Sequence, residues 1–116
     1  METKIERIAW PNAEAKAALG STLSESVERD LKTGHAQCYK LAGKAVGYMV
    51  TRIETYELVI CAAAGAGLVE GFKAVEAGAL GKFKSIRCHC NDWRIERLYA
   101  RVGLDFVETV YRKRLV

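Results

Sequence analysis

The chain has 116 residues, of which 50% are hydrophobic and 28% are charged, a composition typical of a globular protein and not of a disordered one. This length predicts one domain over residues 1–116. The longest apolar run, Leu58 to Val69, is much shorter than the roughly 20 residues of a membrane span. Residues 1–7 lack the apolar stretch of a signal peptide. We therefore expect a soluble, cytoplasmic protein with no membrane partner.

The net charge and the cysteines argue against two kinds of site. A formal charge of +4 is mild, and no aromatic residues are interleaved with a basic stripe, so the sequence predicts no nucleic-acid partner. Cys38, Cys61, Cys88 and Cys90 lie in apolar runs and are expected to be reduced and buried. His89 lies between two of them and would point to the other strand face, so we expect no metal site.

The first part of the chain predicts one strand and two helices. Residues 4–10, KIERIAW, alternate in polarity as a short strand does. Residues 12–19 are rich in strong helix formers. Residues 23–33 place apolar side chains four residues apart, which predicts a second helix capped by Ser21 or Thr22.

Three strands are expected next. Residues 36–42 and 45–54 flank a turn at Gly43, which predicts a hairpin. The third strand, residues 56–64, is apolar on both faces. Such a strand belongs in the middle of a sheet.

The C-terminal half predicts alternating helices and strands. A helix begins near residue 68, and a strand over residues 83–90 follows it. Asp92 can cap a helix over residues 93–102, and residues 104–116 read as one long strand whose exposed edge could pair in a homodimer. The complete order is β-α-α-β-β-β-α-β-α-β, which predicts an α+β fold with a mixed central β-sheet flanked by helices.

The joint between the third strand and the following helix, AAAGAG over residues 62–67, allows two interpretations. Backbone N–H groups at a helix N-terminus are unpaired and lie at the positive end of the helix dipole, so they favour a phosphate. Glycines there would leave the amides uncovered. The alternative is a tight turn of small residues that packs against the sheet.

The element order and the segments AAAGAGLVEGFKAV, FKSIRCHCND and IERLYARVGLDFVE resemble the GNAT N-acetyltransferase superfamily. In that family a central strand leads into a Q/R-x-x-G-x-G/A loop, whose amides bind the pyrophosphate of acetyl-CoA. Gly65, Ala66 and Gly67 match the G-x-G part, and Ala62 stands at the Q/R position. The resemblance implies that acetyl-CoA binds at these four residues together with Ile60 and Asn91.

A later helix of the family reads roughly L-Y-x-x-x-G-F. Leu98, Tyr99 and Gly103 match it, with Leu104 in place of phenylalanine. The resemblance implies that Tyr99 protonates the leaving CoA thiolate. An amine acceptor needs a general base, and either Glu57, at the start of the third strand, or Glu54, just before it, could serve through a water. An ordinary exposed charge at the end of a strand is the alternative for both residues.

Two functions are therefore expected from the sequence. One is acetyl-CoA-dependent N-acetylation of an unidentified amine. The other is a non-catalytic GNAT-like protein that binds a partner or serves in assembly, similar to the compact acetyltransferase-like proteins of tailed bacteriophages. Ala62 and the single strand expected after Gly103 favour the second function, whereas Gly65, Gly67 and Tyr99 favour the first.

Overall fold

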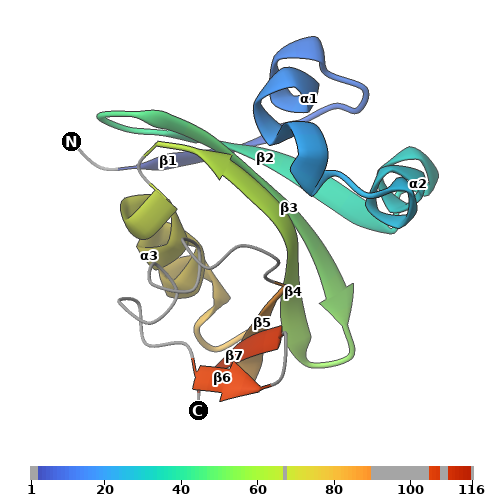
Figure 1. Ribbon diagram of the computed structural model, residues 1–116. Coiled ribbons are helices and arrows are strands. Elements are labelled where there is room, and N and C mark those ends of the chain that lie inside the picture. The colour runs from blue at the N-terminus through green and yellow to red at the C-terminus, as the bar shows by residue number, and fades with distance from the viewer. Residues whose placement is uncertain (1–2, 67, 90–104, 108–109, 116) are drawn as a thin grey trace.

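The computed structural model describes residues 3–66, 68–89, 105–107 and 110–115. They form one seven-stranded sheet flanked by helices (Figure 1). The elements in chain order are β1 (Lys4–Ile8), α1 (Ala13–Leu19), a 3-10 turn η1 (Gly20–Thr22), α2 (Glu25–Thr33), β2 (Ala36–Ala42), β3 (Val46–Glu54), β4 (Glu57–Gly65), α3 (Leu68–Ala79), β5 (Ser85–His89), β6 (Asp105–Val107) and β7 (Val110–Arg114).

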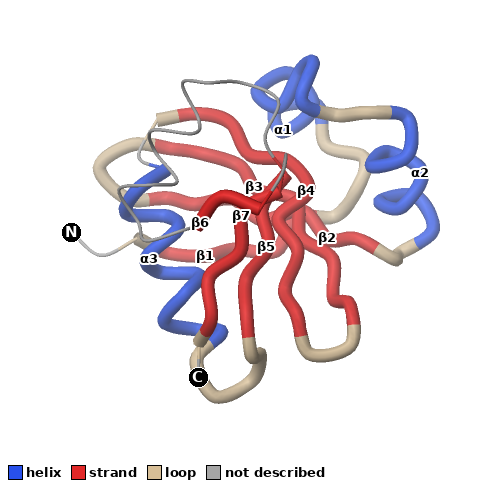
Figure 2. The backbone as a smooth tube through the Cα atoms, turned by 60° about the horizontal axis from the view of Figure 1, so that its bottom comes forward, coloured by secondary structure: helices blue, strands red, loops and turns tan. Residues whose placement is uncertain are grey.

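The sheet has the strand order β1-β2-β3-β4-β5-β7-β6. Neighbouring strands are antiparallel except for β4 and β5, which are parallel. Helices α1 and α2 cover one face, and α3 covers the other (Figures 1 and 2). The predicted α+β fold with a mixed sheet and a central third strand is therefore confirmed.

Two of the sequence-based expectations need correction. The second helix is capped by Ser24, whose hydroxyl accepts a hydrogen bond of 3.2 Å from the Val27 N–H, because residues 20–22 form the 3-10 turn instead of a cap. The last segment is two antiparallel strands, β6 and β7, and not one long strand. The helix expected over residues 93–102 lies outside the described residues.

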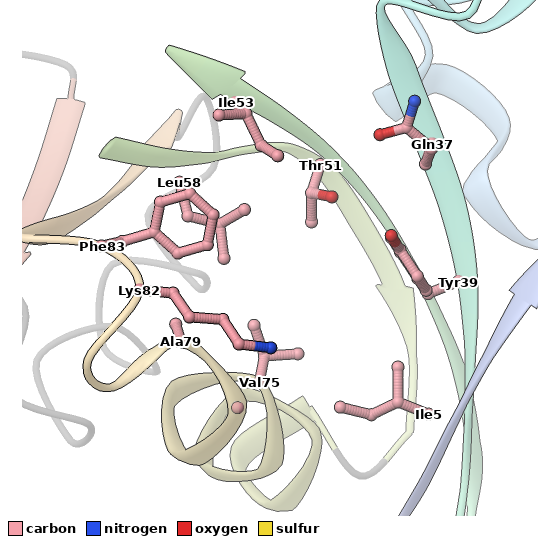
Figure 3. Close-up of a pocket in the computed structure, with 11 residues that line it drawn as sticks. Ile5, Gln37, Tyr39, Thr51, Ile53, Leu58, Val75, Ala79, Lys82 and Phe83 are labelled. Carbon is pink, nitrogen blue, oxygen red and sulfur yellow. The ribbon is translucent and has the colours of Figure 1, made fainter. Parts of the chain in front are cut away.

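The sheet separates two apolar clusters. One lies under α3 and includes Leu58, Ile60 and Phe72, all buried. The other lies under α1 and α2 and includes Leu19 and Ala62. Between the C-terminal half of α3 and strands β1 to β4 the packing leaves a cavity (Figure 3). Among the described residues, no helix is long and apolar enough to cross a membrane.

Gly65, the last residue of β4, is fixed by contact with the neighbouring strand. Its φ of +106° is a backbone angle that residues other than glycine rarely adopt. A Cβ at this position would lie 2.7 Å from the Val46 carbonyl oxygen and 2.7 Å from the Gly47 Cα. Gly47 lies opposite Gly65 in the ladder. The glycine at this position is therefore required by the packing of backbone on backbone, whatever the joint binds.

We expect Gly65→Ala to lower the free energy of unfolding by about 2–4 kcal/mol, through backbone strain and the clash with β3. Gly78→Ala is the matched control, because its Cβ would meet nothing within 4 Å inside α3. The control should gain about 0.5–1 kcal/mol from helix propensity. Urea unfolding of the three proteins measures both effects. Equal stabilities would contradict this account of Gly65.

Candidate functional site

Among the described residues, the edge of β4 that faces β5 is open beyond Ile60. On one side β4 pairs with β3 from Glu57 to Gly65. On the other side its parallel pairing with β5 ends at Ile60 and Cys88, so that residues 61–65 have no strand beside them there among the described residues. Backbone N–H and C=O groups on this edge can hydrogen-bond an extended ligand, as an added strand would.

A β-bulge lies where the open edge begins. Val50 pairs with Ala62 and Thr51 pairs with Ile60, which leaves Cys61 as the extra residue on β4. A bulge bends the strand and locally increases its twist. The bend therefore falls at the position where β4 and β5 cease to pair.

The open edge leads directly to the N-terminus of α3. Only Ala66 and residue 67 separate β4 from Leu68, the first helical residue. Ala66 is exposed, and Gly67 lies outside the described residues. The first N–H groups of a helix have no partner within it, so an anion can accept from them. Glu70, exposed in the first turn of α3, adds a negative charge at the same end.

Two residues expected to bind acetyl-CoA have buried side chains. Ile60 is 1% exposed and packs under α3, and Ala62 is 6% exposed and packs under α1 and α2. Any contact that they make with a ligand comes from the backbone. An arginine in place of Ala62 would introduce a charge into an apolar cluster. It would not provide a side-chain contact to a bound phosphate. Asn91 lies outside the described residues.

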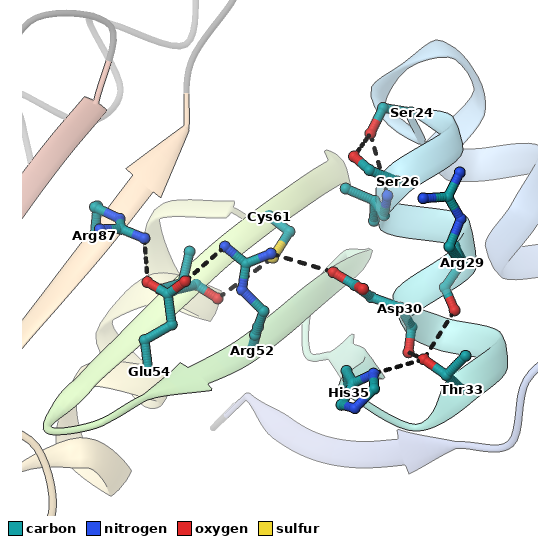
Figure 4. Close-up of polar contacts among 12 residues, drawn as sticks. Ser24, Ser26, Arg29, Asp30, Thr33, His35, Arg52, Glu54, Cys61 and Arg87 are labelled. Carbon is teal, nitrogen blue, oxygen red and sulfur yellow. Dashed lines mark hydrogen bonds and ion pairs between the residues drawn. The ribbon is translucent and has the colours of Figure 1, made fainter.

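Glu57 belongs to a network of charged residues on the α2 face of the sheet. The Ser85 hydroxyl donates to Glu57 Oε2 at 2.6 Å, and Arg87 Nη1 lies 3.3 Å from Oε1. Arg87 also pairs with Glu54, which joins it to Arg52 (Figure 4). The Glu57 side chain is only 14% exposed, so it is not the ordinary exposed charge that was the alternative interpretation.

The network continues to α2. Arg52 contacts Asp30 at 3.2 Å and Glu54 at 3.0 Å, and thereby connects the sheet to the helix (Figure 4). Sequence reasoning found Glu57 but missed its partners, because Ser85 and Arg87 come from β5. The parallel register of β4 and β5, which the sequence does not reveal, brings them together. Tyr99, the predicted acid, lies outside the described residues.

Cys61 lies beside this network. Burial raises the pKa of the Cys61 thiol, the positive charge of Arg52 opposes that rise, and the charges of Asp30 and Glu54 add to it. Burial also raises the pKa of Cys38. A folded thiol with a raised pKa keeps its proton where the unfolded thiol has lost it. The thiols of Cys38 and Cys61 therefore lower the free energy of unfolding as the pH rises above the pKa of an ordinary thiol.

Three solved structures illustrate what this fold resembles. A Bacillus subtilis acetyltransferase in complex with CoA is 13% identical, with a TM-score of 0.69 over 99% of this chain and 100% of its own. A GNAT family acetyltransferase from Elizabethkingia anophelis with acetyl-CoA bound is 13% identical, with a TM-score of 0.75 over 98% and 99%. The AtaT–AtaR complex bound to DNA is 13% identical, with a TM-score of 0.62 over 97% and 94%.

The similarity extends to structure and not to sequence. No protein-family model matches the chain, and no curated protein matches it either. The solved structures nevertheless cover almost all of it. The chain therefore has the fold of the GNAT acetyltransferases.

The expectation of no nucleic-acid partner is contradicted. The AtaT–AtaR neighbour, with nearly the full length of this chain aligned, is a protein complex bound to DNA. The sequence argument failed because it looked for a basic, aromatic-rich stripe within a single chain. A protein of this fold can belong to a complex that is bound to DNA, and the composition of a single chain does not reveal such a complex.

We expect Arg52→Met to move the pH midpoint of Cys61 alkylation upward, because it removes the charge that lowers the pKa of this thiol. At pH 8 the reaction with iodoacetamide should slow about two- to fivefold, a modest factor because the arginine is partly exposed. Alkylation rates are measured by peptide mass spectrometry across a range of pH. A shift in the pKa moves the midpoint of the rate curve, whereas a change in the reagent's access to Cys61 alters only the plateau rate at high pH. Arg29→Met, at an exposed site on α2, is the control. An unchanged midpoint in Arg52→Met would refute the coupling.

Proposed function

We propose that the protein is an N-acetyltransferase that transfers the acetyl group of acetyl-CoA to an amine. The observation that carries the proposal is the open edge of β4, which begins at the bulge and ends at the N-terminus of α3. Two structures of the same fold contain CoA or acetyl-CoA. Acetyl-CoA is thus the cosubstrate that this arrangement fits best.

The backbone would do most of the binding. The extended arm of acetyl-CoA would lie along residues 61–65, and its pyrophosphate would accept from the amides of Ala66, Gly67 and the first turn of α3. Ile60 and Ala62 would take part through their main chains, because their side chains are buried. Asn91 is carried into this proposal from the sequence resemblance alone.

The chemistry requires two proton transfers. The amine nitrogen forms a bond to the thioester carbonyl carbon, the bond from that carbon to sulfur breaks, the nitrogen loses a proton and the thiolate gains one. Glu57 would take the proton from the nitrogen through a water. Ser85 and Arg87 hold the Glu57 carboxylate in place. Tyr99 would supply the proton to the thiolate, a role that rests on the sequence resemblance. The acceptor is an amine.

Two observations favour a second function. Both oxygens of Glu57 already contact Ser85 and Arg87, and Ala62 supplies no polar side chain to a phosphate. A non-catalytic GNAT-like protein, including the kind found in tailed bacteriophages, would need neither a general base nor a side-chain contact to a phosphate. A calorimetric titration with acetyl-CoA distinguishes the two functions, because only the enzyme requires binding.

We expect Glu70→Gln to tighten acetyl-CoA binding about two- to fivefold at low salt, because it removes a negative charge at the N-terminus of α3. The gain should shrink as ionic strength rises. Glu25→Gln changes a glutamate in the first turn of α2 and should leave the affinity unchanged. If the parent and Glu70→Gln both bind no acetyl-CoA at millimolar concentration, the enzyme proposal is wrong.

We further expect Glu57→Gln to keep acetyl-CoA affinity within a factor of about two and to lower kcat about 10²- to 10⁴-fold, the usual contribution of a general base. Glutamine is nearly isosteric, so Ser85 keeps a hydrogen-bond partner. Single-turnover rates with a panel of amines, measured by release of free thiol, provide the readout. Full activity in this variant would remove Glu57 from the mechanism.

A further inference from the structure

The cavity beside α3 is separate from the proposed acetyl-CoA site. It has a volume of about 300 Å³ and lies between the C-terminal half of α3 and strands β1 to β4 (Figure 3). Its apolar walls include Leu58, Val75 and Phe83. None of the described residues that we propose for acetyl-CoA binding lines it. Its volume falls at the lower end of the range for small-molecule sites.

The rim of the cavity exposes apolar side chains. Ile53 on β3 is 60% exposed and Ile5 on β1 is 40% exposed, and both line the opening. Figure 3 shows them on the strands that face α3 and the loop after it. Apolar surface gathered around a concavity indicates a binding site more strongly than scattered exposed residues do. A ligand with an apolar body would cover it.

The polar groups of the cavity favour a negative charge. Lys82 is the one charged side chain among the described residues that line it, and its amine points into the space between helix and strands (Figure 3). The Tyr39 hydroxyl lies on the opposite wall. Within the described part of the chain, neither the Lys82 amine nor the Tyr39 hydroxyl makes an ion pair or a side-chain hydrogen bond. A cation and a hydroxyl without partners can both donate to a carboxylate.

We propose that this cavity binds a small amphipathic carboxylate, such as a medium-chain fatty acid. The apolar chain would pack against Leu58, Val75 and Phe83, and the carboxylate would lie between Lys82 and Tyr39. Charge complementarity selects the anion over a neutral or cationic ligand, and the volume of about 300 Å³ suits a small molecule better than a second protein chain. The inference does not depend on the acetyltransferase proposal.

The test uses octanoate and its neutral counterpart octanamide, titrated into the full chain by calorimetry and by amide NMR. Octanoate should bind about tenfold more tightly than octanamide, and its shifts should centre on Val75, Lys82 and Phe83. Lys82→Met should reduce this preference to about one. Lys73→Met, which removes an exposed lysine of α3 outside the cavity, should retain it.

A second pair of variants tests the location. Gly78 lines the cavity inside α3, and a side chain there has open space, so Gly78→Leu should fill the cavity without opposing helix formation and should abolish octanoate binding. Ala77→Leu, on the exposed neighbouring position, should bind octanoate as the parent does. The proposal is overturned if octanoate does not bind at millimolar concentration, if binding survives Gly78→Leu, or if saturating acetyl-CoA displaces octanoate. A chain that binds octanoate but no acetyl-CoA would overturn the acetyltransferase proposal alone.

Discussion

The unequal pairing of β4 on its two sides is the constraint on which the candidate site depends. Against β3 the strand pairs to its last residue, where Gly65 and Gly47 bring the two backbones into contact. Against β5 it pairs only as far as Ile60. If both sides paired along the whole length, the edge that leads to α3 would be closed by a strand. The close contact with β3 therefore holds the end of β4 in place, while the opposite edge of the same residues has no pairing with β5.

The alternation of side chains along β4 places different chemistry on the two faces of the sheet. Leu58 and Ile60 pack under α3, whereas Glu57 joins the network of Ser85 and Arg87 on the opposite face. The bulge at Cys61 interrupts this alternation where the edge opens. The two proposed binding sites therefore use separate groups, the backbone at the end of β4 and the side chains of the cavity under α3.

Much of the architecture follows from local sequence, and much of the site does not. The apolar run over residues 58–61 identified the central strand, because only a strand covered on both faces tolerates it. The sequence suggested that Gly65 lacks a side chain so that a phosphate can approach. In the structure, the space that a Cβ of Gly65 would take is occupied by the backbone of Gly47. Arg87 carried no recognisable signal, since its role arises from strand register between segments about thirty residues apart. The cap at Ser24 was missed because the 3-10 turn delayed the helix.

The position of Ala62 changes how its departure from the family pattern is understood. Taken from sequence, alanine at the Q/R position is the loss of a phosphate contact. In the structure, β4 continues three residues past Ala62 and α3 begins three residues after β4 ends, so the side chain at 62 lies within the sheet and under α1 and α2. A long polar side chain there would have to displace core residues such as Leu19, which is 1% exposed. The burial of position 62 thus excludes the family's side-chain contact on steric grounds, and recognition of a phosphate would have to come from main-chain amides at the start of α3.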